Sequence, residues 1–549
     1  MTARTRIAVA GMTMVLLTGV IGATVGLALP IRAHAETAGV LSGADVQLII
    51  AQAVGRAQQI GQPATIAVVD REGSVLGSFQ MTGARTDVTI GLPGGSPDPD
   101  GLENVAVPAG AAVAAVSKAG TAAYLSTGGT AFSTRTFGFI VQENIPPRVT
   151  SSQPGGDLFG VQFSNLPCSD VAFGPLPLGL SGDPGGMPIY KNGVAVGGIG
   201  VEIDGRYDLD VNRSDNDQDA EEDVARSGAR NYAPPAAIRA DQILIDGMRL
   251  DYANAPEMAA PVPAFADLPG TLLSPVLPTQ PSHYVSVLLG GLAGKADPRY
   301  VPSRGSAAGL SAAEVDAILT RASQRASQTR SAIRLPVAQP TEVNIAVVDT
   351  KGAVLGQFST QDAPQFGFDV SAQRARTAVF FSGAAASDSL RAAWPGAAAY
   401  ADAAATDGIK LDGSIALSTL SIGALSAPSY AQGDAPPGPF VLSATAFSPF
   451  NTGLASALTR QAFIDGANRR PTAGCTPVPG LHNGVQASSG GLPLYRDGVL
   501  VGAIGISGDG IEQDDAIAAA GAFGFEAPPA IRADHVTVRG VPLPYSIFG

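Results

Sequence analysis

Charged residues, histidine and cysteine are all scarce in this 549-residue sequence. Only 15% of the residues are charged, the formal net charge is −13, and there are 4 histidines and 2 cysteines. No cluster of Lys and Arg is present, and an acidic chain without one disfavours a nucleic-acid partner, whose phosphates bind clustered cations. The motifs H-E-x-x-H, G-x-S-x-G and paired C-x-x-C are also absent, so the sequence shows no signature of a zinc protease, a serine hydrolase or a dithiol site.

Apolar residues make up 45% of the chain, which is ample for burying several hydrophobic cores. A length of 549 residues favours two to four domains. The 67 glycines and 42 prolines approach a fifth of the sequence, so we expect long irregular segments between the regular elements.

The N-terminus has the order of features found in a secretory signal peptide. Two arginines precede an uncharged run at residues 7–30, and the triplet A-H-A follows at residues 33–35. This order predicts a signal peptide over residues 1–35, with cleavage after Ala35. The alternative is an uncleaved membrane anchor, because the apolar run is about long enough to span a bilayer. Cleavage implies a secreted or periplasmic protein, in a compartment where disulfides persist.

One twelve-residue string occurs twice in the chain. Residues 66–77 read IAVVDREGSVLG and residues 345–356 read IAVVDTKGAVLG, with nine of the twelve positions identical. The string is β-rich around a central Asp-x-x-Gly turn, and it therefore predicts a β-hairpin. Apolar residues at helical spacing precede both copies, over residues 41–62 and from Leu310 onward, and they predict a helix before each hairpin.

A second hairpin signal is repeated as well. YKNGVAVGGIG at residues 190–200 corresponds to YRDGVLVGAIG at residues 495–505, each with Asn-Gly or Asp-Gly between apolar runs. Between the two hairpins of each copy, residues 111–126 and 369–383 are Ala-rich or apolar at helical spacing. Both stretches predict buried helices.

Each copy therefore reads as helix, strand pair, helix, variable region, strand pair, acidic-headed helix and last strand, the last strand lying within residues 233–250 or 527–543. A mostly antiparallel five-stranded sheet packed with helices satisfies this order, so the predicted fold class is α+β. We place the first domain at residues 36–253 and the second at residues 310–549. Residues 254–309 are rich in Pro, Ala and Leu, have no counterpart in the repeat, and are expected to form a linker.

Taken in this order, the strings resemble the GlcG/HbpS family of haem-binding and related domains. The resemblance rests on the first helix, the AVVD-x-x-G-x-x-LG hairpin, the helix with SKAGTA or QRARTA, and the GG-x-P-[IL]-Y-[KR]-[ND]-G-x-x-VG-x-IG hairpin. It implies two tandem profilin-like domains and a link to haem binding, haem or iron handling, redox sensing, or glycolate or corrinoid metabolism. Unlike the family's short unit, these units contain insertions of tens of residues, and two of them are fused as a built-in dimer.

If the resemblance extends to haem, the iron needs an axial ligand and the propionates need cations. The absence of C-x-x-C-H excludes covalent c-type attachment. The candidate cofactor-binding residues are Lys118, Thr121, Tyr190, Arg374, Thr377, His482 and Tyr495. The alternative is that the tyrosines are half-buried strand residues, that the cations lie on a solvated helix face and that the histidine is an ordinary surface residue.

The two cysteines lie at nearly equivalent places in the two copies. Cys168 precedes its GG-x-P string by 17 residues, and Cys475 precedes its own by 15. In an exported protein this placement favours one Cys168–Cys475 disulfide that joins the halves. Two buried free thiols, or thiolate ligands to a metal or a haem, are the alternatives.

An acidic segment at residues 208–223 holds eight acidic residues in sixteen. Asp210, Asn212 and Ser214 alternate like the ligands of a calcium loop, but Asp215 stands where such a loop needs glycine. The other interpretation is a solvated loop whose carboxylates favour the N-terminus of the following helix. We therefore expect no metal site here.

The resemblance implies an exported protein that binds haem or a related tetrapyrrole and acts in haem or iron handling or in redox sensing. A structural or protein-interaction module that has lost its ligand is the alternative, and an accessory enzyme of small hydroxy-acid or corrinoid metabolism is a third. No nucleophile, general base or metal cluster stands out, so no catalytic residue is assigned. Neither a nucleic acid nor, after signal cleavage, a membrane is expected as a partner. The fused copies are expected to form an internal pseudo-dimer, with further oligomerisation left open.

Overall fold

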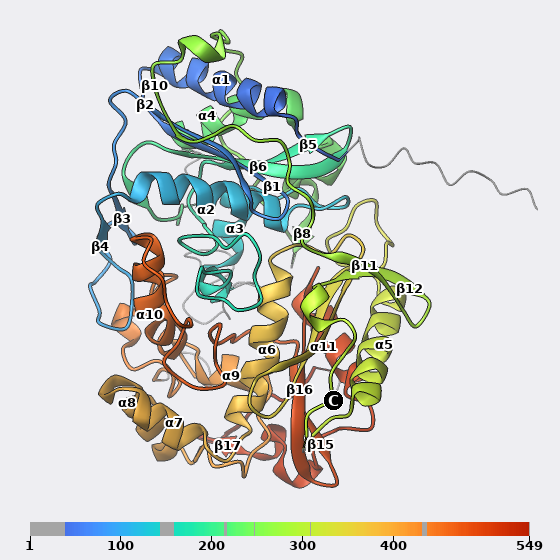
Figure 1. Ribbon diagram of the computed structural model, residues 1–549. Helices are drawn as coiled ribbons and strands as arrows, with labels where there is room; N and C mark the ends of the chain where they lie inside the picture. The colour runs from blue at the N-terminus through green and yellow to red at the C-terminus, as the bar shows by residue number, and fades with distance from the viewer. Residues whose placement is uncertain are drawn as a thin grey trace, which may run out of the picture.

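The computed structural model describes residues 39–142, 159–212, 217–245, 247–307, 309–430 and 436–547. The signal peptide predicted at residues 1–35 lies outside these ranges. Figure 1 shows two lobes, one above the other, each built around its own sheet. Among the described residues, no helix combines the length and the apolar character that crossing a bilayer requires.

The sheet of the first lobe has five antiparallel strands. Their spatial order is β10 (Gly270–Ser274), β2 (Val75–Met81), β1 (Thr65–Asp70), β6 (Val194–Glu202) and β5 (Gly186–Lys191). Helices α1 (Gly43–Ile60) and α4 (Ala220–Gly228) pack together on one face of this sheet, and α2 (Gly110–Leu125) covers the other face.

Helix α1 shows why the local sequence folds in this way. Its N-cap is Ser42, whose hydroxyl accepts from the backbone N–H of Asp45, while the Asp45 carboxylate accepts from the N–H of Ser42. This reciprocal pair satisfies donors that the first turn would otherwise leave free. Val46, Ile49 and Ile50 recur at helical spacing and are fully buried against the sheet.

The sheet of the second lobe has six antiparallel strands. Their order is β11 (Val285–Leu289), β12 (Leu292–Ala296), β14 (Val354–Thr360), β13 (Val343–Val348), β16 (Val499–Gly508) and β15 (Gly491–Arg496). Helices α5 (Ala312–Gln328) and α11 (Ile511–Gly521) pack on one face, and α6 (Gly367–Phe381) packs on the other.

The two lobes are copies down to their irregularities. In the first hairpin, the register of β1 and β2 shifts between Val68 and Val69, and that of β13 and β14 shifts between Val347 and Val348. The second hairpins shift at the equivalent step as well, just before the tyrosine of each strand. Because a bulge is a defined local feature of a strand pair, these matches support the predicted duplication, and the predicted α+β fold class is confirmed.

Two details of the predicted sheets are wrong. The last strand expected within residues 233–250 or 527–543 does not join either main sheet; each string instead forms a separate two-stranded hairpin, β8 (Leu244–Ile245) with β9 (Met248–Arg249) or β17 (Thr537–Val538) with β18 (Val541–Pro542). In each string, a tight turn with a glycine at positive φ closely follows the first strand, so this strand is too short to span a sheet. The second lobe also has six strands in its sheet, not five.

The segment expected as a linker, residues 254–309, supplies the extra strands. It adds β10 to the edge of the first sheet, next to β2, and then adds the β11–β12 hairpin to the edge of the second sheet, next to β14. These additions cover main-chain groups that the repeated hairpins alone would leave unpaired. The segment is therefore part of both lobes.

The insertions contribute much of the contact between the lobes. The first copy adds β3 (Val88–Ile90), β4 (Val105–Val107) and α3 (Thr134–Ile140), with β7 (Arg206–Tyr207) pairing against β3; the second adds α7 (Ala386–Ala393), α8 (Pro395–Thr406), α9 (Thr419–Leu425) and α10 (Leu454–Ala467). In Figure 1, α10 rises beside the first-lobe insertion. There the guanidinium of Arg460 donates to the carbonyl of Gly101 at 2.8 Å, and the hydroxyl of Tyr400 donates to Asp100 at 2.7 Å.

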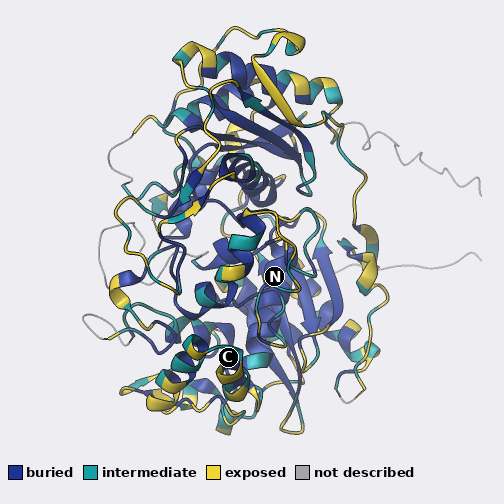
Figure 2. Ribbon diagram, turned by 60° about the vertical axis from the view of Figure 1, so that its left-hand side comes forward, coloured by how far each residue is buried: buried dark blue, intermediate teal, exposed yellow. Residues whose placement is uncertain are grey.

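The core is continuous across this contact. Figure 2 shows both sheets buried along most of their length, with exposed residues concentrated on outer helices and loops. The apolar cluster of the first lobe includes Phe366, Val370 and Phe463 of the second copy. Cys168 and Cys475 form a disulfide between the two insertions, with Cα atoms 4.9 Å apart, which is the pairing expected from the sequence. The halves are thus joined by packing and by a covalent bond.

Candidate functional site

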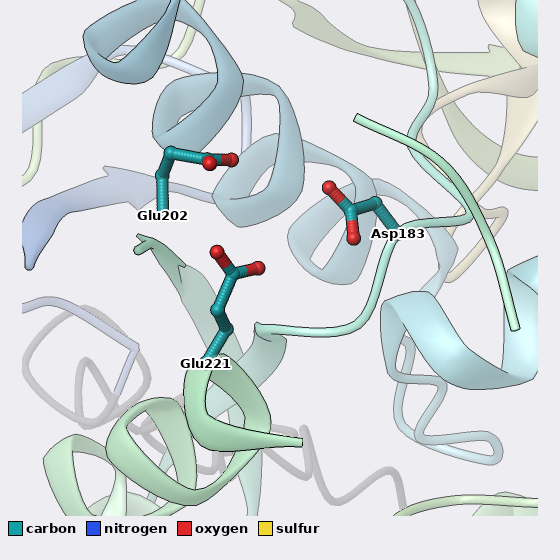
Figure 3. Close-up of side chains that lie close together, drawn as sticks. All are labelled: Asp183, Glu202 and Glu221. Atoms are coloured by element: carbon teal, nitrogen blue, oxygen red, sulfur yellow. The ribbon is translucent and has the colours of Figure 1, made fainter. Parts of the chain in front are cut away.

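A buried charge cluster lies between α2 and the second hairpin of the first lobe. The ammonium group of Lys118 is 2.8 Å from a carboxylate oxygen of Asp183 and 3.0 Å from one of Glu202, and it also contacts Glu221. All four side chains are buried, and Lys118 is completely so. Figure 3 shows the three carboxylates converging from separate segments of the chain. We call these four residues the Lys118 cluster.

Three different elements bring the carboxylates together. Asp183 lies in the loop before β5, Glu202 is the last residue of β6, and Glu221 is in the first turn of α4. The close approach of α2 to β6 depends on Gly200, where an added Cβ would lie 2.0 Å from the carbonyl oxygen of Ala115. Only glycine allows this spacing, which places the middle of α2 against the end of the hairpin.

The Lys118 cluster holds more carboxyl groups than its one cation can neutralise. Burial raises the pKa of Asp183 and of Glu221 well above the ordinary range, and it raises the pKa of Glu202 to about 6. Burial alone would lower the pKa of Lys118, but the three carboxylates outweigh it, so that the pKa of the ammonium is raised. The cluster therefore contains a charged lysine, and its carboxyl groups keep their protons to higher pH than exposed carboxyl groups do.

The equivalent site in the second lobe has one cation and one carboxylate, so its charge is balanced. Arg374 replaces Lys118 on α6, and its guanidinium bonds Asp514 at 2.6 Å and the hydroxyl of Ser488 at 2.7 Å. Asp514 is the counterpart of Glu221, and the positions of Asp183 and Glu202 are occupied by Ser488 and Ser507. The excess of carboxyl groups is therefore a property of the first lobe.

The three carboxylates lie close enough for a metal ion, since one oxygen of each falls within 4.8 Å of the others. However, the Lys118 ammonium already stands among them and supplies the positive charge. A divalent cation would bind here only with this side chain displaced or neutral. In the described residues, the cluster is thus a buried lysine site.

The structure places the predicted cations in the protein interior. Lys118 and Arg374 are both fully buried and ion-paired, so the interpretation that they lie on a solvated helix face is wrong. Thr121 and Thr377, one turn further along their helices, donate to main-chain carbonyls at 2.7 and 2.8 Å and accept main-chain N–H groups of the following loops. All four side chains fix the helices to neighbouring loops and are engaged within the protein.

The contacts of the three other predicted residues differ from those of Lys118 and Arg374. The hydroxyl of Tyr190 donates to the carbonyls of Thr127 and Thr130 at 2.7 and 2.9 Å, and Tyr495 is buried at the equivalent position of β15. Both tyrosines are buried and not half-buried. His482 is partly buried beside the disulfide, where its carbonyl accepts from the N–H of Cys475 at 2.7 Å.

The acidic segment is only partly a solvated loop. Glu221 and Glu222 in the first turn of α4 are buried, and Arg135 contacts both Glu222 and Asp210. The calcium-loop pattern cannot be followed to its end, because Ser214 and its neighbours lie outside the described residues. These ion pairs could not be predicted from the sequence, because the cations that bind the segment come from α2 and α3, about 100 residues earlier in the chain.

A small pocket lies beside α4 in the first lobe. It is lined by Met187, Arg226, Ala229, Ala233, Pro234, Arg239, Tyr252 and Glu257, and its volume is about 30 Å³. Met187 comes from β5 and Arg226 from α4, whereas Arg239 stacks over the ring of Tyr252 at 5.5 Å. The pocket thus combines a thioether, a phenol and two guanidinium groups.

Half of this arrangement is repeated in the second lobe. Arg532 lies over Tyr545 at 4.9 Å, as Arg239 lies over Tyr252, and each arginine also bonds the aspartate two residues later. The counterparts of Met187 and Arg226 are Leu492 and Ala519. The sulfur and the second cation are therefore specific to the first lobe.

The residues that line the first-lobe pocket can be compared with the groups that a haem, implied by the family resemblance, would need. The pocket offers groups of the right chemistry, because thioether sulfur and phenol oxygen ligate haem iron and guanidinium groups pair with propionates. Its volume is far below the ~300 Å³ at which pockets for drug-sized ligands begin. The donor set fits a tetrapyrrole, but the enclosed volume is too small for one.

Comparison with known proteins supports the resemblance in one segment. Residues 449–522 match the family model described as HbpS-like, "Haem degrading protein HbpS-like". This segment contains α10, β15, β16 and α11 of the second lobe. Among curated proteins, none matches the chain.

Two solved structures are similar over about a third of the chain. The crystal structure of a PduOC:heme complex is 21% identical with a TM-score of 0.21, over 35% of this chain and 93% of that one. Protein ORFY of Klebsiella pneumoniae is 18% identical with a TM-score of 0.22, over 36% of this chain and 95% of that one. The family model on residues 449–522 confirms the predicted resemblance, and in this segment of its second lobe the chain is similar to the HbpS-like family.

Proposed function

We propose that this chain is an exported protein that binds haem or a related tetrapyrrole and acts in haem or iron handling or in redox sensing. The observation that supports a haem-related ligand is the match of residues 449–522 to a family model described by haem degradation. Export is supported by the sequence order at residues 1–35, which has the features of a cleaved signal peptide.

In this proposal, the first-lobe pocket supplies the residues that bind the ligand. Met187 and Arg226 lie at the positions of Leu492 and Ala519, and both of these second-lobe residues fall within the segment that matches the family model. A bound haem would supply an iron centre able to take an axial ligand. Met187 or Tyr252 would provide that ligand, and the guanidinium of Arg226 would hold a propionate.

Access of a ligand to this pocket depends on the segment that follows Tyr252. The guanidinium of Arg226 donates to the carbonyl of Ala255, the hydroxyl of Ser227 donates to that of Met258 at 3.1 Å, and the N–H of Ala255 donates to Glu222 at 2.6 Å. These three hydrogen bonds hold residues 255–258 against α4. Binding a tetrapyrrole requires this segment to move, which frees Arg226 for the ligand.

The test is a hemin titration of the mature chain, followed by its visible spectrum. We expect a sharp Soret band that saturates at one equivalent, because only the first lobe has the sulfur and the second cation. Met187→Leu combined with Arg226→Ala gives the first lobe the residues of the second and should abolish saturation. Leu492→Met, the matched control in the second lobe, should leave the titration unchanged. Absorbance of free hemin without saturation would overturn the proposal.

A structural or protein-interaction role is the second candidate. The observation that favours it is the engagement of Lys118 and Arg374 in buried ion pairs, since the cations expected to hold propionates are used within the protein. In that case the wild-type chain and the Met187→Leu, Arg226→Ala variant would give the same unsaturated hemin spectrum.

A further inference from the structure

Lys295 occupies an unusual position between the two lobes. It lies on β12, and its side chain is partly exposed. Its ammonium nitrogen is 5.6 Å from the ring centre of Tyr284 and 5.4 Å from that of Phe368, and these two rings are stacked with centres 4.0 Å apart. The amine therefore lies beside two stacked aromatic rings, at the end of a side chain that is partly exposed.

The acidic groups around this amine are bound to other partners. Glu72, from the turn between β1 and β2, accepts from the hydroxyl of Ser282 at 2.5 Å and contacts the ring nitrogen of His283 at 3.0 Å. Asp362 is 3.1 Å from Arg71 and 2.8 Å from Arg334.

The third acidic neighbour is Glu342, which accepts from the N–H of Asp362 at 3.0 Å. The phenol of Tyr284 accepts from the amide of Gln365 at 2.6 Å. Within the described parts of the chain, no carboxylate lies within ion-pair distance of Lys295.

The chain contains four other lysines, which provide a comparison. Lys118 is enclosed by three carboxylates, and Lys191 is paired with Asp45 at 2.7 Å. Lys351 and Lys410 are exposed to solvent. Lys295 alone, among the lysines, combines partial exposure with an aromatic neighbour and no paired carboxylate in the described residues.

We propose that Lys295 is a nucleophilic amine site that binds a small aldehyde or ketone covalently and reversibly at the junction of the lobes. The physical basis is the known activation of lysine by desolvation and by a neighbouring cation. Both conditions are met here. Burial lowers the pKa of Lys295 to about 7, and the charge of the nearby Arg71 guanidinium contributes to the shift.

The reaction is a condensation that needs no oxidant or reductant. The lone pair of the neutral amine attacks the carbonyl carbon, and the C=O π bond opens to give a carbinolamine. Loss of the hydroxyl group with a proton from nitrogen releases water and leaves a C=N bond between Lys295 and the ligand. The stacked rings of Tyr284 and Phe368 offer a flat apolar surface beside this bond, which favours an aromatic or other apolar carbonyl compound.

The test uses the full mature chain with benzaldehyde as the probe and sodium cyanoborohydride to trap the imine as a secondary amine. After digestion, mass spectrometry measures the rate of modification at each lysine in the same sample. At pH 7 we expect Lys295 to react at least about tenfold faster than Lys351 or Lys410, because a far larger fraction of it is uncharged. This advantage should disappear at pH 10.

Two results would overturn the proposal. One is a rate at Lys295 equal to or below that of Lys351 and Lys410 at pH 7. The other is a rate at Lys295 that rises between pH 7 and pH 10 in parallel with the exposed lysines. The Lys295→Arg variant keeps a cation beside the rings and should lose the fast adduct while keeping the slow ones. Since the comparison is made within one wild-type chain, it does not depend on the folding of the variant or on haem binding.

Discussion

Lys118 and Arg374 occupy the same position on α2 and α6, yet Lys118 is paired with three carboxyl groups and Arg374 with one. The duplicated fold thus contains the same buried cation site twice, balanced in one lobe and over-acidic in the other. The difference arises at two positions, where Asp183 and Glu202 stand opposite Ser488 and Ser507. It has consequences for stability that can be measured.

The first prediction concerns pH. Burial raises the pKa of Glu202, of Asp208 and of Asp509 to about 6, above the ordinary carboxyl value. A carboxyl group with a raised folded-state pKa contributes stability that is fully present below its unfolded pKa, about 4, and is lost as the pH rises through 6. We therefore expect the melting temperature to fall by several degrees between pH 5 and pH 7.5.

Circular dichroism melts across this range provide the measurement. Glu202→Gln removes one of the titrating groups while keeping its shape, so its melting temperature should depend less on pH than that of the wild type. A melting temperature that is flat or rises from pH 5 to pH 7.5 would contradict the assignment of raised pKa values to these carboxyl groups.

The second prediction concerns the lysine itself. Lys118→Met removes the one cation from the cluster and leaves its carboxyl groups without a partner in a buried site. Loss of one member of a buried ion pair typically costs about 3–5 kcal/mol. Urea unfolding at pH 7.5 should show a loss of this size in the free energy of unfolding, and the loss should shrink at pH 5, where the carboxyl groups are protonated.

Arg374→Met is the matched variant, because it leaves only Asp514 unpaired. We expect a smaller loss and a weaker dependence on pH. Equal losses for the two variants at both pH values would show that the additional carboxyl groups of the first lobe do not interact with Lys118.

The local order of the fold could be predicted from the sequence because its signals are short-range. The capping pair Ser42 and Asp45 lies within one turn, and each hairpin string contains both strands and the turn between them. The family resemblance followed from the same strings. The strands β10, β11 and β12 could not be placed, because their partners lie far away in sequence and no repeated string marks them.

The Lys118 cluster could be predicted only in part from the sequence. Asp183, Glu202 and Glu221 come from three segments, and no spacing in the sequence connects them to α2. One signal was available: α2 is apolar on all sides, so a lysine within it must be buried and must therefore have partners. The sequence could have predicted a buried cation at Lys118, but not which carboxyl groups surround it.

The third prediction uses the close contact between helix and sheet in both lobes. An added Cβ at Gly200 would lie 2.0 Å from the carbonyl oxygen of Ala115, and one at Gly505 would lie 2.0 Å from that of Ser371. Gly200→Ala and Gly505→Ala should each lower the melting temperature markedly, because α2 or α6 must move away from its sheet. Gly43→Ala is the control, since its nearest neighbour is 3.8 Å away. Similar melting temperatures for all three variants would contradict the packing described here.

The fourth prediction concerns the disulfide between the insertions. Cys168 and Cys475 close a loop of 307 residues, and restricting so long a loop in the unfolded chain can stabilise a protein by about 5 kcal/mol. We expect alkylation to label no thiol in the native protein and two after reduction, as measured by intact mass. Cys168→Ser with Cys475→Ser should unfold at lower temperature and lower urea concentration than the wild type.

The lobes should nevertheless stay associated in this double variant. Arg376 is 2.6 Å from Asp170, two residues after Cys168, and Asp369 accepts from the hydroxyl of Ser169 at 2.5 Å. Because these contacts lie beside the disulfide and survive its removal, unfolding of the variant should remain a single transition at a lower midpoint. Two separate transitions, one for each lobe, would show that the covalent bond and not the packed interface makes the lobes unfold together.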